Sequence, residues 1–202
     1  MRRVAARKGI ELKKANRLRI GGAVLTLAAI SAIGAGGPAS ASPEPQLRGV
    51  DAVIDIKGAG QNLRFKGDDE VSEGATLQVN NLTDPIADGP HTFSLVTKQA
   101  MPKGGKKRRK CENLKLKVCE RIQEAHNIEF GPMPPPITYH VDHGFEGWDR
   151  PFDKQTDGDS FFTEEQDDSD SRTVSADPGK LRYFCIVHPF MKGKIQVIPG
   201  MM

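Results

Sequence analysis

The sequence is poor in cysteine, in aromatic residues and, after its N-terminal segment, in long apolar runs. Only three of its 202 residues are cysteine, and aromatic residues make up 6%. None of the cysteines belongs to a Cys-x-x-Cys-His motif, which excludes haem attachment of that kind. Beyond residue 41 the chain has no apolar run of about 20 residues, so we expect no membrane span there.

The N-terminal segment has the composition of an export signal. Residues 2–19 hold eight Lys or Arg against one acid, residues 20–33 are apolar, and small residues follow as far as Ala39-Ser40-Ala41. Basic, then apolar, then small is typical of a secretory signal peptide, which we assign to residues 1–41. Cleavage and retention as an anchor both stay open, as does the export route. The protein is therefore predicted to be exported, periplasmic or extracellular, and either free or held at the cell envelope.

The basic charge of the chain belongs to this signal. The whole sequence has 29 basic and 26 acidic residues, but residues 42–202 have 21 basic and 25 acidic ones. The predicted mature protein is mildly acidic, and nothing in its charge indicates a nucleic-acid partner.

Export changes the meaning of the three cysteines, because thiols outside the cytoplasm tend to oxidise. Cys111 and Cys119 are close in sequence and are the natural disulfide pair. Cys185 is left over, and an unpaired cysteine in an exported protein needs another explanation.

Short strand-like segments dominate the chain from residue 50 onward, separated by turns rich in Gly, Pro and Asp. They predict an all-β domain, a β-sandwich, over residues 46–202. Residues 98–172 interrupt this pattern with a proline-rich stretch and one helical spacing, formed by Leu114, Val118, Ile122 and Ala125. We interpret 98–172 as a partly helical, loop-rich insertion, which the single tryptophan, Trp148, anchors to the sandwich.

The unpaired cysteine begins the string Cys185-Ile186-Val187-His188-Pro189-Phe190-Met191, between two strand-like segments. Thiolate, imidazole and thioether donors together favour copper, and two His, one Cys and a weak axial Met are typical of electron-transfer copper. The second imidazole is expected from His91, at a loop-to-strand junction. We therefore predict one type 1 copper site per chain, with His91, Cys185, His188 and Met191 as metal ligands.

These residues also carry a family resemblance. The Cys-x2-His-x2-Met loop is similar to the short ligand loop of amicyanin, and Pro90-His91-Thr92 resembles the first-ligand motif of the plastocyanin and azurin superfamily. The resemblance implies a cupredoxin, with a cupredoxin-like Greek-key β-sandwich. It also implies that an Asn near the first His fastens the two ligand loops together, a role for Asn80 or Asn81.

A site filled by protein ligands has no open position for substrate, so we predict an electron carrier and no enzyme. The chain has no His-x-His motif of multicopper oxidases and no second Cys in its ligand loop, as a dinuclear centre would need. Redox partners are predicted to dock near His188, Pro189 and Phe190 on a monomer. The alternative is a copper-handling protein that carries or stores Cu(I) with the same ligands.

Two motifs of the insertion have open interpretations. The basic run Lys106–Lys110 could dock an acidic partner or a lipid headgroup, or it could be solvated or face the acidic part of the insertion. His140, Asp142 and His143 have suitable chemistry for a second metal site, but surface histidines near acids are common.

Overall fold

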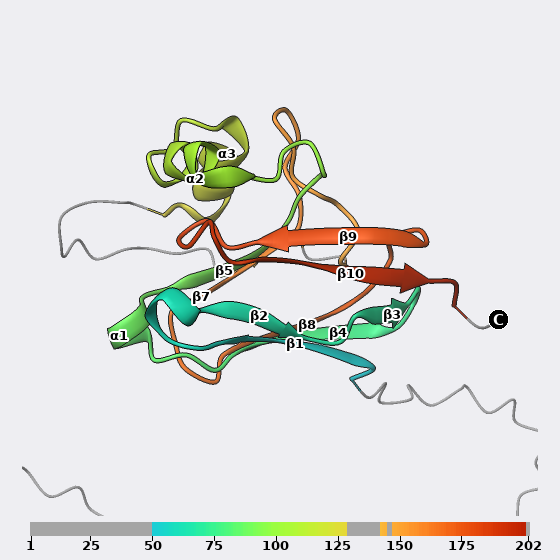
Figure 1. Cartoon of the computed structure of the whole chain (residues 1–202). Coiled ribbons are helices and arrows are strands. Elements are labelled where there is room, and N and C mark those ends of the chain that lie inside the picture. Colours follow the sequence, from blue (N-terminus) through green and yellow to red (C-terminus); the bar gives the residue numbers. More distant parts are fainter. Residues whose placement is uncertain (1–49, 129–141, 145–146, 201–202) are drawn as a thin grey trace, which may run out of the picture. The chain divides into compact units, whose positions relative to one another are not determined.

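The structure is a computed structural model that describes residues 50–128, 142–144 and 147–200 (Figure 1). The predicted signal peptide therefore lies outside the described residues. Among the helices in the described ranges, none is long and apolar enough to cross a membrane.

Strands in the described part form two sheets that pack face to face as a sandwich (Figure 1). The smaller sheet has the order β2-β1-β4-β8, with a parallel β1–β4 pair at its centre. Its strands are β1 (Ala52–Lys57), β2 (Arg64–Gly67), β4 (Thr76–Asn81) and β8 (Ser169–Thr173). The alternating burial of β1 and β4 fits strands with one face on a core and one face in solvent.

The larger sheet has six strands in the order β3-β10-β9-β5-β7-β6. They are β3 (Glu70–Ser72), β10 (Lys192–Ile198), β9 (Gly179–Phe184), β5 (His91–Leu95), β7 (Ser160–Thr163) and β6 (Asp142–His143). β10 pairs in parallel with β3, and the other neighbours are antiparallel. The predicted β-sandwich is confirmed.

The main core fills the space between the sheets. It combines Ile54, Leu77 and Val79 of the smaller sheet with residues of the larger one, among them Phe93 and Tyr183. Trp148 is fully buried in this core, where its ring meets Phe93 edge-on and its Nε1–H donates to the carbonyl of Leu77. The prediction that Trp148 ties its segment to the sandwich is confirmed.

A second core lies on the outer face of the larger sheet, under a helical hairpin formed by α2 (Gly104–Glu112) and α3 (Lys117–His126) (Figure 1). Val118 and Ile122 of α3 pack there with Phe162 and Phe184 of the sheet. Because both faces of the central strands are covered, β5 and β7 are buried at every position and do not alternate.

The predicted insertion needs a corrected C-terminal boundary. β6 and β7 lie inside the range 98–172 and β8 begins inside it, yet all three belong to the two sheets. Sequence patterning missed β7 because both of its faces are buried. It missed the first residues of β8 because that edge strand, Ser-Asp-Ser-Arg-Thr, is entirely polar.

The hairpin differs from the prediction in having two helices. α3 matches the predicted helical spacing, whereas α2 has no apolar periodicity that could have revealed it, and Cys111 is its only buried residue. The predicted Cys111–Cys119 disulfide is confirmed and joins the two helices. The other short elements are the 3-10 turn η1 (Gly60–Asn62) and α1 (Pro85–Asp88), whose first turn is capped by Asp84.

Candidate metal centre

The structure brings three predicted ligands together at one end of the larger sheet. His91 is the first residue of β5, Cys185 directly follows β9, and His188 lies in the loop between β9 and β10. β5 and β9 are neighbours in the sheet, so their pairing places His91 beside Cys185 across 94 residues of sequence. Among the described residues this is the group of His, Cys, Asp or Glu side chains that could hold a metal ion.

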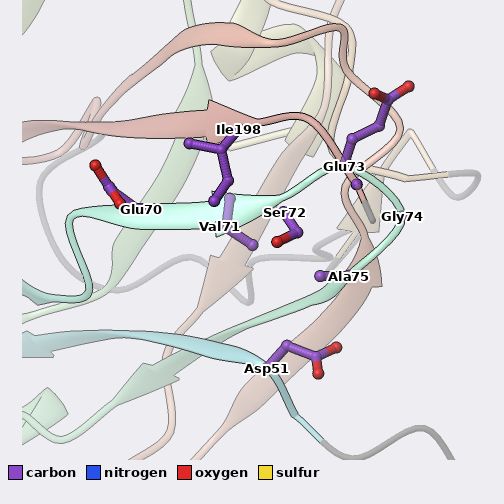
Figure 2. A pocket seen from close by; sticks show the side chains of 9 residues that line it. Asp51, Glu70, Val71, Ser72, Glu73, Gly74, Ala75 and Ile198 are labelled. Atoms are coloured by element: carbon purple, nitrogen blue, oxygen red, sulfur yellow. The ribbon is translucent and has the colours of Figure 1, made fainter. Parts of the chain in front are cut away.

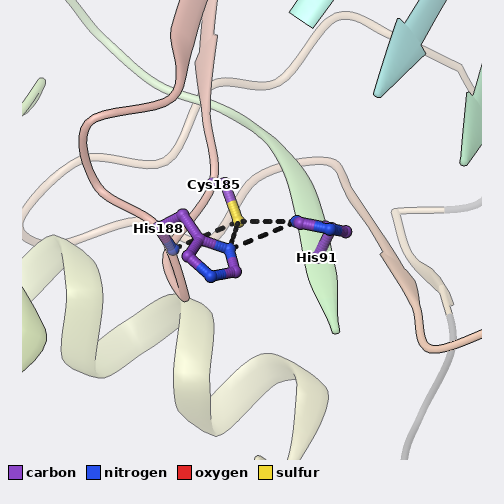
Figure 3. A group of neighbouring side chains, drawn as sticks. All are labelled: His91, Cys185 and His188. Atoms are coloured by element: carbon purple, nitrogen blue, oxygen red, sulfur yellow. Dashed lines mark hydrogen bonds between the residues drawn. The ribbon is translucent and has the colours of Figure 1, made fainter. Parts of the chain in front are cut away.

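The three donor atoms form a nearly symmetric triangle (Figure 3). The Nδ1 atoms of His91 and His188 are 3.3 Å apart, and each is 4.0 Å from Cys185 Sγ. The point in their plane equidistant from all three lies about 2.2 Å from each atom, near the roughly 2.0–2.3 Å of metal–imidazole and metal–thiolate bonds. The residues thus fit a trigonal coordination plane of two imidazoles and one thiolate.

The backbone of Met191, the predicted axial ligand, is hydrogen-bonded to the residues of the other two ligands in its loop. The Cys185 N–H donates to the Met191 carbonyl at 3.1 Å, and the Met191 N–H donates to the His188 carbonyl at 2.8 Å. Its side chain is buried in the same core cluster as Cys185. These two bonds close the ligand loop into a tight turn.

Two backbone N–H groups point at the sulfur of Cys185. Thr92 donates at 3.3 Å and His188 at 3.4 Å. Hydrogen bonds to the charged form favour the thiolate, and such donors around the sulfur tune the potential of a copper–thiolate site.

Thr92 fastens the two ligand loops together, because its Oγ1 also accepts from the Ile186 N–H at 2.9 Å. The prediction that Asn80 or Asn81 has this role is wrong. Asn81 is buried but bonds to Thr83, Thr163 and Glu165, and Asn80 donates to Asp55. The assignment failed because it sought an Asn, whereas the residue that follows His91 and is paired beside Cys185 is a Thr.

A chain of buried hydroxyls links Thr92 to α3. Ser94 Oγ donates to Thr92 Oγ1 at 3.1 Å, and Ser94 and Ser160 Oγ are 2.6 Å apart. His126 Nε2 lies 2.7 Å from Ser160 Oγ. Since the one proton of Ser94 goes to Thr92, Ser160 donates to Ser94 and the N–H of His126 Nε2 donates to Ser160.

Burial sets the protonation of the ligands before any metal binds. It lowers the pKa of His91 to about 4, with a further contribution from His188, and it lowers the pKa of His188 as well. Burial raises the pKa of the Cys185 thiol, while the N–H groups of Thr92 and His188 oppose this rise. At neutral pH both imidazoles are neutral and able to ligate, and the thiol keeps a proton that a metal would displace.

The predicted ligands differ in exposure, and only one of them has an accessible edge. His91 and Cys185 are fully buried and Met191 nearly so, whereas His188 and Phe190 are partly exposed and their rings meet edge-on. Pro189 is buried, so the prediction that it forms part of the docking surface is wrong at this residue. Phe190 is partly exposed, and its buried part packs against the main core.

The second predicted metal site is not described in full. His143 Nδ1 lies 2.8 Å from the carbonyl of Gly158, and His140 lies outside the described residues, so this site stays a prediction.

A cavity of about 470 Å³ opens at the end of β10 that is far from the three predicted ligands (Figure 2). It is lined by Asp51, Glu70 and Glu73 and includes no predicted ligand.

Two observations identify the type of fold: the two packed β-sheets, and the triangle of His91, Cys185 and His188 at one end of them. The fold is cupredoxin-like. The donor set points to copper, since a buried thiolate with two imidazoles and a nearby thioether is a copper environment.

No family model and no curated protein matches the chain. Solved structures similar to it include a purple cupredoxin from Nitrosopumilus maritimus, at 14% identity over 73% of this chain and 100% of that one, with a TM-score of 0.36. Auracyanin A, a "blue" copper protein from Chloroflexus aurantiacus, has 17% identity over 72% and 96%, with a TM-score of 0.34. Auracyanin B has 14% identity over 73% and 87%, with a TM-score of 0.38. At such TM-scores the cupredoxin-like assignment rests on the sheet topology and the ligand triangle.

Proposed function

We propose that this chain is an exported blue (type 1) copper protein that carries single electrons between redox partners. One copper per chain would be held by His91, Cys185, His188 and Met191. The observation that carries the proposal is the triangle of two Nδ1 atoms and one Sγ, with sides of 3.3, 4.0 and 4.0 Å.

Bound in this triangle, copper would supply one reversibly exchanged electron, and the chain supplies the conditions for that exchange. The sheet pairing fixes His91 and Cys185, and Thr92 joins their loops, so we expect the ligands to keep one arrangement in both oxidation states. The buried thiol is shielded from water, and the partly exposed ring of His188 is the route for the electron to the surface.

A carrier is favoured over an enzyme because the four side chains would fill the coordination sphere of the copper and leave no position for a substrate. Storage or delivery of Cu(I) is the second candidate, since a thiolate and a thioether also bind Cu(I) well. Reversible cycling between Cu(I) and Cu(II) in the intact protein, measured by voltammetry, distinguishes the carrier from tight, one-directional Cu(I) binding.

The spectrum of the copper-loaded protein tests the site. We expect an intense visible thiolate-to-copper band and the paramagnetic resonance of a type 1 site, and we expect Cys185→Ser to remove both while the fold is retained. The double variant Cys111→Ser and Cys119→Ser is the matched control, because it removes the other two cysteines and leaves the band in place. A colourless copper complex of the unaltered chain would contradict the proposal.

A further inference from the structure

The charged residues of α2 destabilise it as a helix. Its nine residues include the five consecutive cations Lys106–Lys110 and two glycines, and only Cys111 is buried. Like charges three or four residues apart destabilise a helix by about 0.2–0.5 kcal/mol per pair, and the cations of the first turn also face the positive end of the helix dipole. The disulfide to Cys119 of α3 therefore holds the helix in place of an apolar face.

The described part of the chain does not neutralise these cations. Ion pairs near the hairpin are Lys117–Glu120 and Arg121–Asp157, and other described acids pair with Arg150 and Arg172. None of Lys106–Lys110 forms an ion pair with a described carboxylate. Residues 98–121 hold ten basic and two acidic residues, whereas the rest of residues 42–202 holds eleven basic and 23 acidic ones. Ten of the 21 basic residues of 42–202 therefore lie in one segment, which contains α2 and the start of α3.

α3, the other helix of the hairpin, lies against the strand that leads to the ligand loop. Val118, Cys119 and Ile122 of α3 share a buried cluster with Phe184 and Ile186, the two neighbours of Cys185. Val187, one residue before His188, packs against both this cluster and the main core. The hairpin therefore packs directly on the segment that carries Cys185 and leads to His188.

A cavity of about 360 Å³ lies between α2, the start of α3 and the loop after β6. Its apolar floor is formed by Ala100, Leu116 and Val118. Four lysines surround this floor: Lys107, Lys115, Lys117 and Lys154. Such a cavity suits a carboxylate side chain, whose charge meets the lysines and whose methylene groups meet the floor.

We propose that α2 and this lysine-lined cavity form the docking surface for an acidic redox protein, which exchanges electrons through His188. The proposal rests on the proposed copper function. An acidic protein is favoured over a lipid surface because the large exposed hydrophobic residues of the described chain are Val50, Leu82, Ile86 and Ile198, none of them in the hairpin. A membrane-binding helix needs apolar side chains to insert beside its cations.

Electron exchange with small probes of opposite charge tests the surface. Hexacyanoferrate(III), an anion, takes one electron from the Cu(I) protein and becomes hexacyanoferrate(II), leaving Cu(II), and tris(phenanthroline)cobalt(III) does the same as a cation. Stopped-flow rates are compared for two variants that each replace five cations with Gln. One neutralises Lys106–Lys110, and the matched control neutralises Lys57, Arg64, Lys66, Lys180 and Lys194.

At low ionic strength we expect the α2 variant to react with the anion roughly tenfold more slowly, in the range of electrostatic steering, while the control changes less than twofold. The cation should show no such loss. Poly-L-glutamate, a probe for an acidic polypeptide, should slow the anion reaction of the unaltered chain and of the control but not that of the α2 variant. The smaller variant Lys107→Gln with Lys115→Gln should show the same direction of change.

Equal slowing of both five-charge variants would overturn the proposed docking surface. The rate would then depend only on the net charge of the protein and not on where the cations lie. Sedimentation with phosphatidylglycerol vesicles that depends on α2, without competition by poly-L-glutamate, would overturn it in favour of a lipid surface. A reversible voltammetric couple in all variants shows that the copper function stands whichever way the docking test falls. Absence of that couple in the unaltered chain overturns the copper function itself.

Discussion

The backbone N–H of Thr92 donates to Cys185 Sγ at 3.3 Å, and this bond joins residues 93 positions apart in the sequence. The hydroxyl of the same threonine accepts a hydrogen bond from the Ile186 N–H. Thr92 therefore bonds both to the sulfur of Cys185 and to the backbone of the residue that follows Cys185. The geometry of the candidate copper site therefore depends on the pairing of β5 with β9 as much as on the ligands.

Thr92→Val should lower the stability of the protein while keeping the N–H to the sulfur. The change leaves the Ile186 N–H and the Ser94 hydroxyl without their shared acceptor in a buried site, at a cost of about 1–3 kcal/mol. Chemical denaturation of the metal-free protein measures the loss. Thr92→Ser keeps the acceptor and should recover much of it, and equal losses in the two variants would show that the hydroxyl is not responsible.

Met191→Leu should keep the blue colour and raise the reduction potential. Leucine preserves the buried apolar volume but removes the thioether, a weak donor that stabilises Cu(II) in the fourth position. We expect a rise of about 60 mV or more, which for one electron is a tenfold change in the equilibrium constant. Voltammetry of the copper-loaded variant checks this, and an unchanged potential would remove Met191 from the ligand set.

Copper(II) binding at pH 7 should release one proton per chain. Burial raises the pKa of the Cys185 thiol, whereas it lowers the pKa of His91 to about 4, so the thiol is protonated and this imidazole is neutral before the metal binds. The apparent affinity should then fall about tenfold for each pH unit lowered below 7, and more steeply once the imidazoles of His188 and, near pH 4, His91 also bind protons. Titration calorimetry in buffers of different ionisation enthalpy counts the proton, and Cys185→Ser should release none.

Removing the Cys111–Cys119 disulfide should loosen α2 before it affects the sandwich. We expect the double Ser variant to lose about 2–3 kcal/mol of unfolding free energy, as estimated for a short loop. Trypsin should cut the Lys106–Lys110 run faster, because Cys111 is the only residue of α2 that is buried. α3 should stay protected, since Val118 and Ile122 remain in the second core. Unchanged cleavage of the run would show that other contacts hold the helix.

The sequence by itself determined the features that are local. Cys185, His188 and Met191 lie within seven residues, so their spacing alone indicates one loop around one metal. The disulfide could be paired because export and closeness leave Cys185 as the odd cysteine. The strands with one buried face, such as β1 and β4, alternate and could be predicted from that alternation.

Tertiary structure alone decided what depends on distant segments. Strand pairing brings His91, which the sequence places only at a loop-to-strand junction, beside Cys185. Thr92, Ser94, Ser160 and His126 form one chain only because β5, β7 and α3 pack against one another. β7 and β8 were assigned to the insertion because a strand buried on both faces and a polar edge strand lack the alternation that marks a half-buried strand. α2 could not be predicted because a covalent bond, rather than an apolar face, keeps its five cations in a helix.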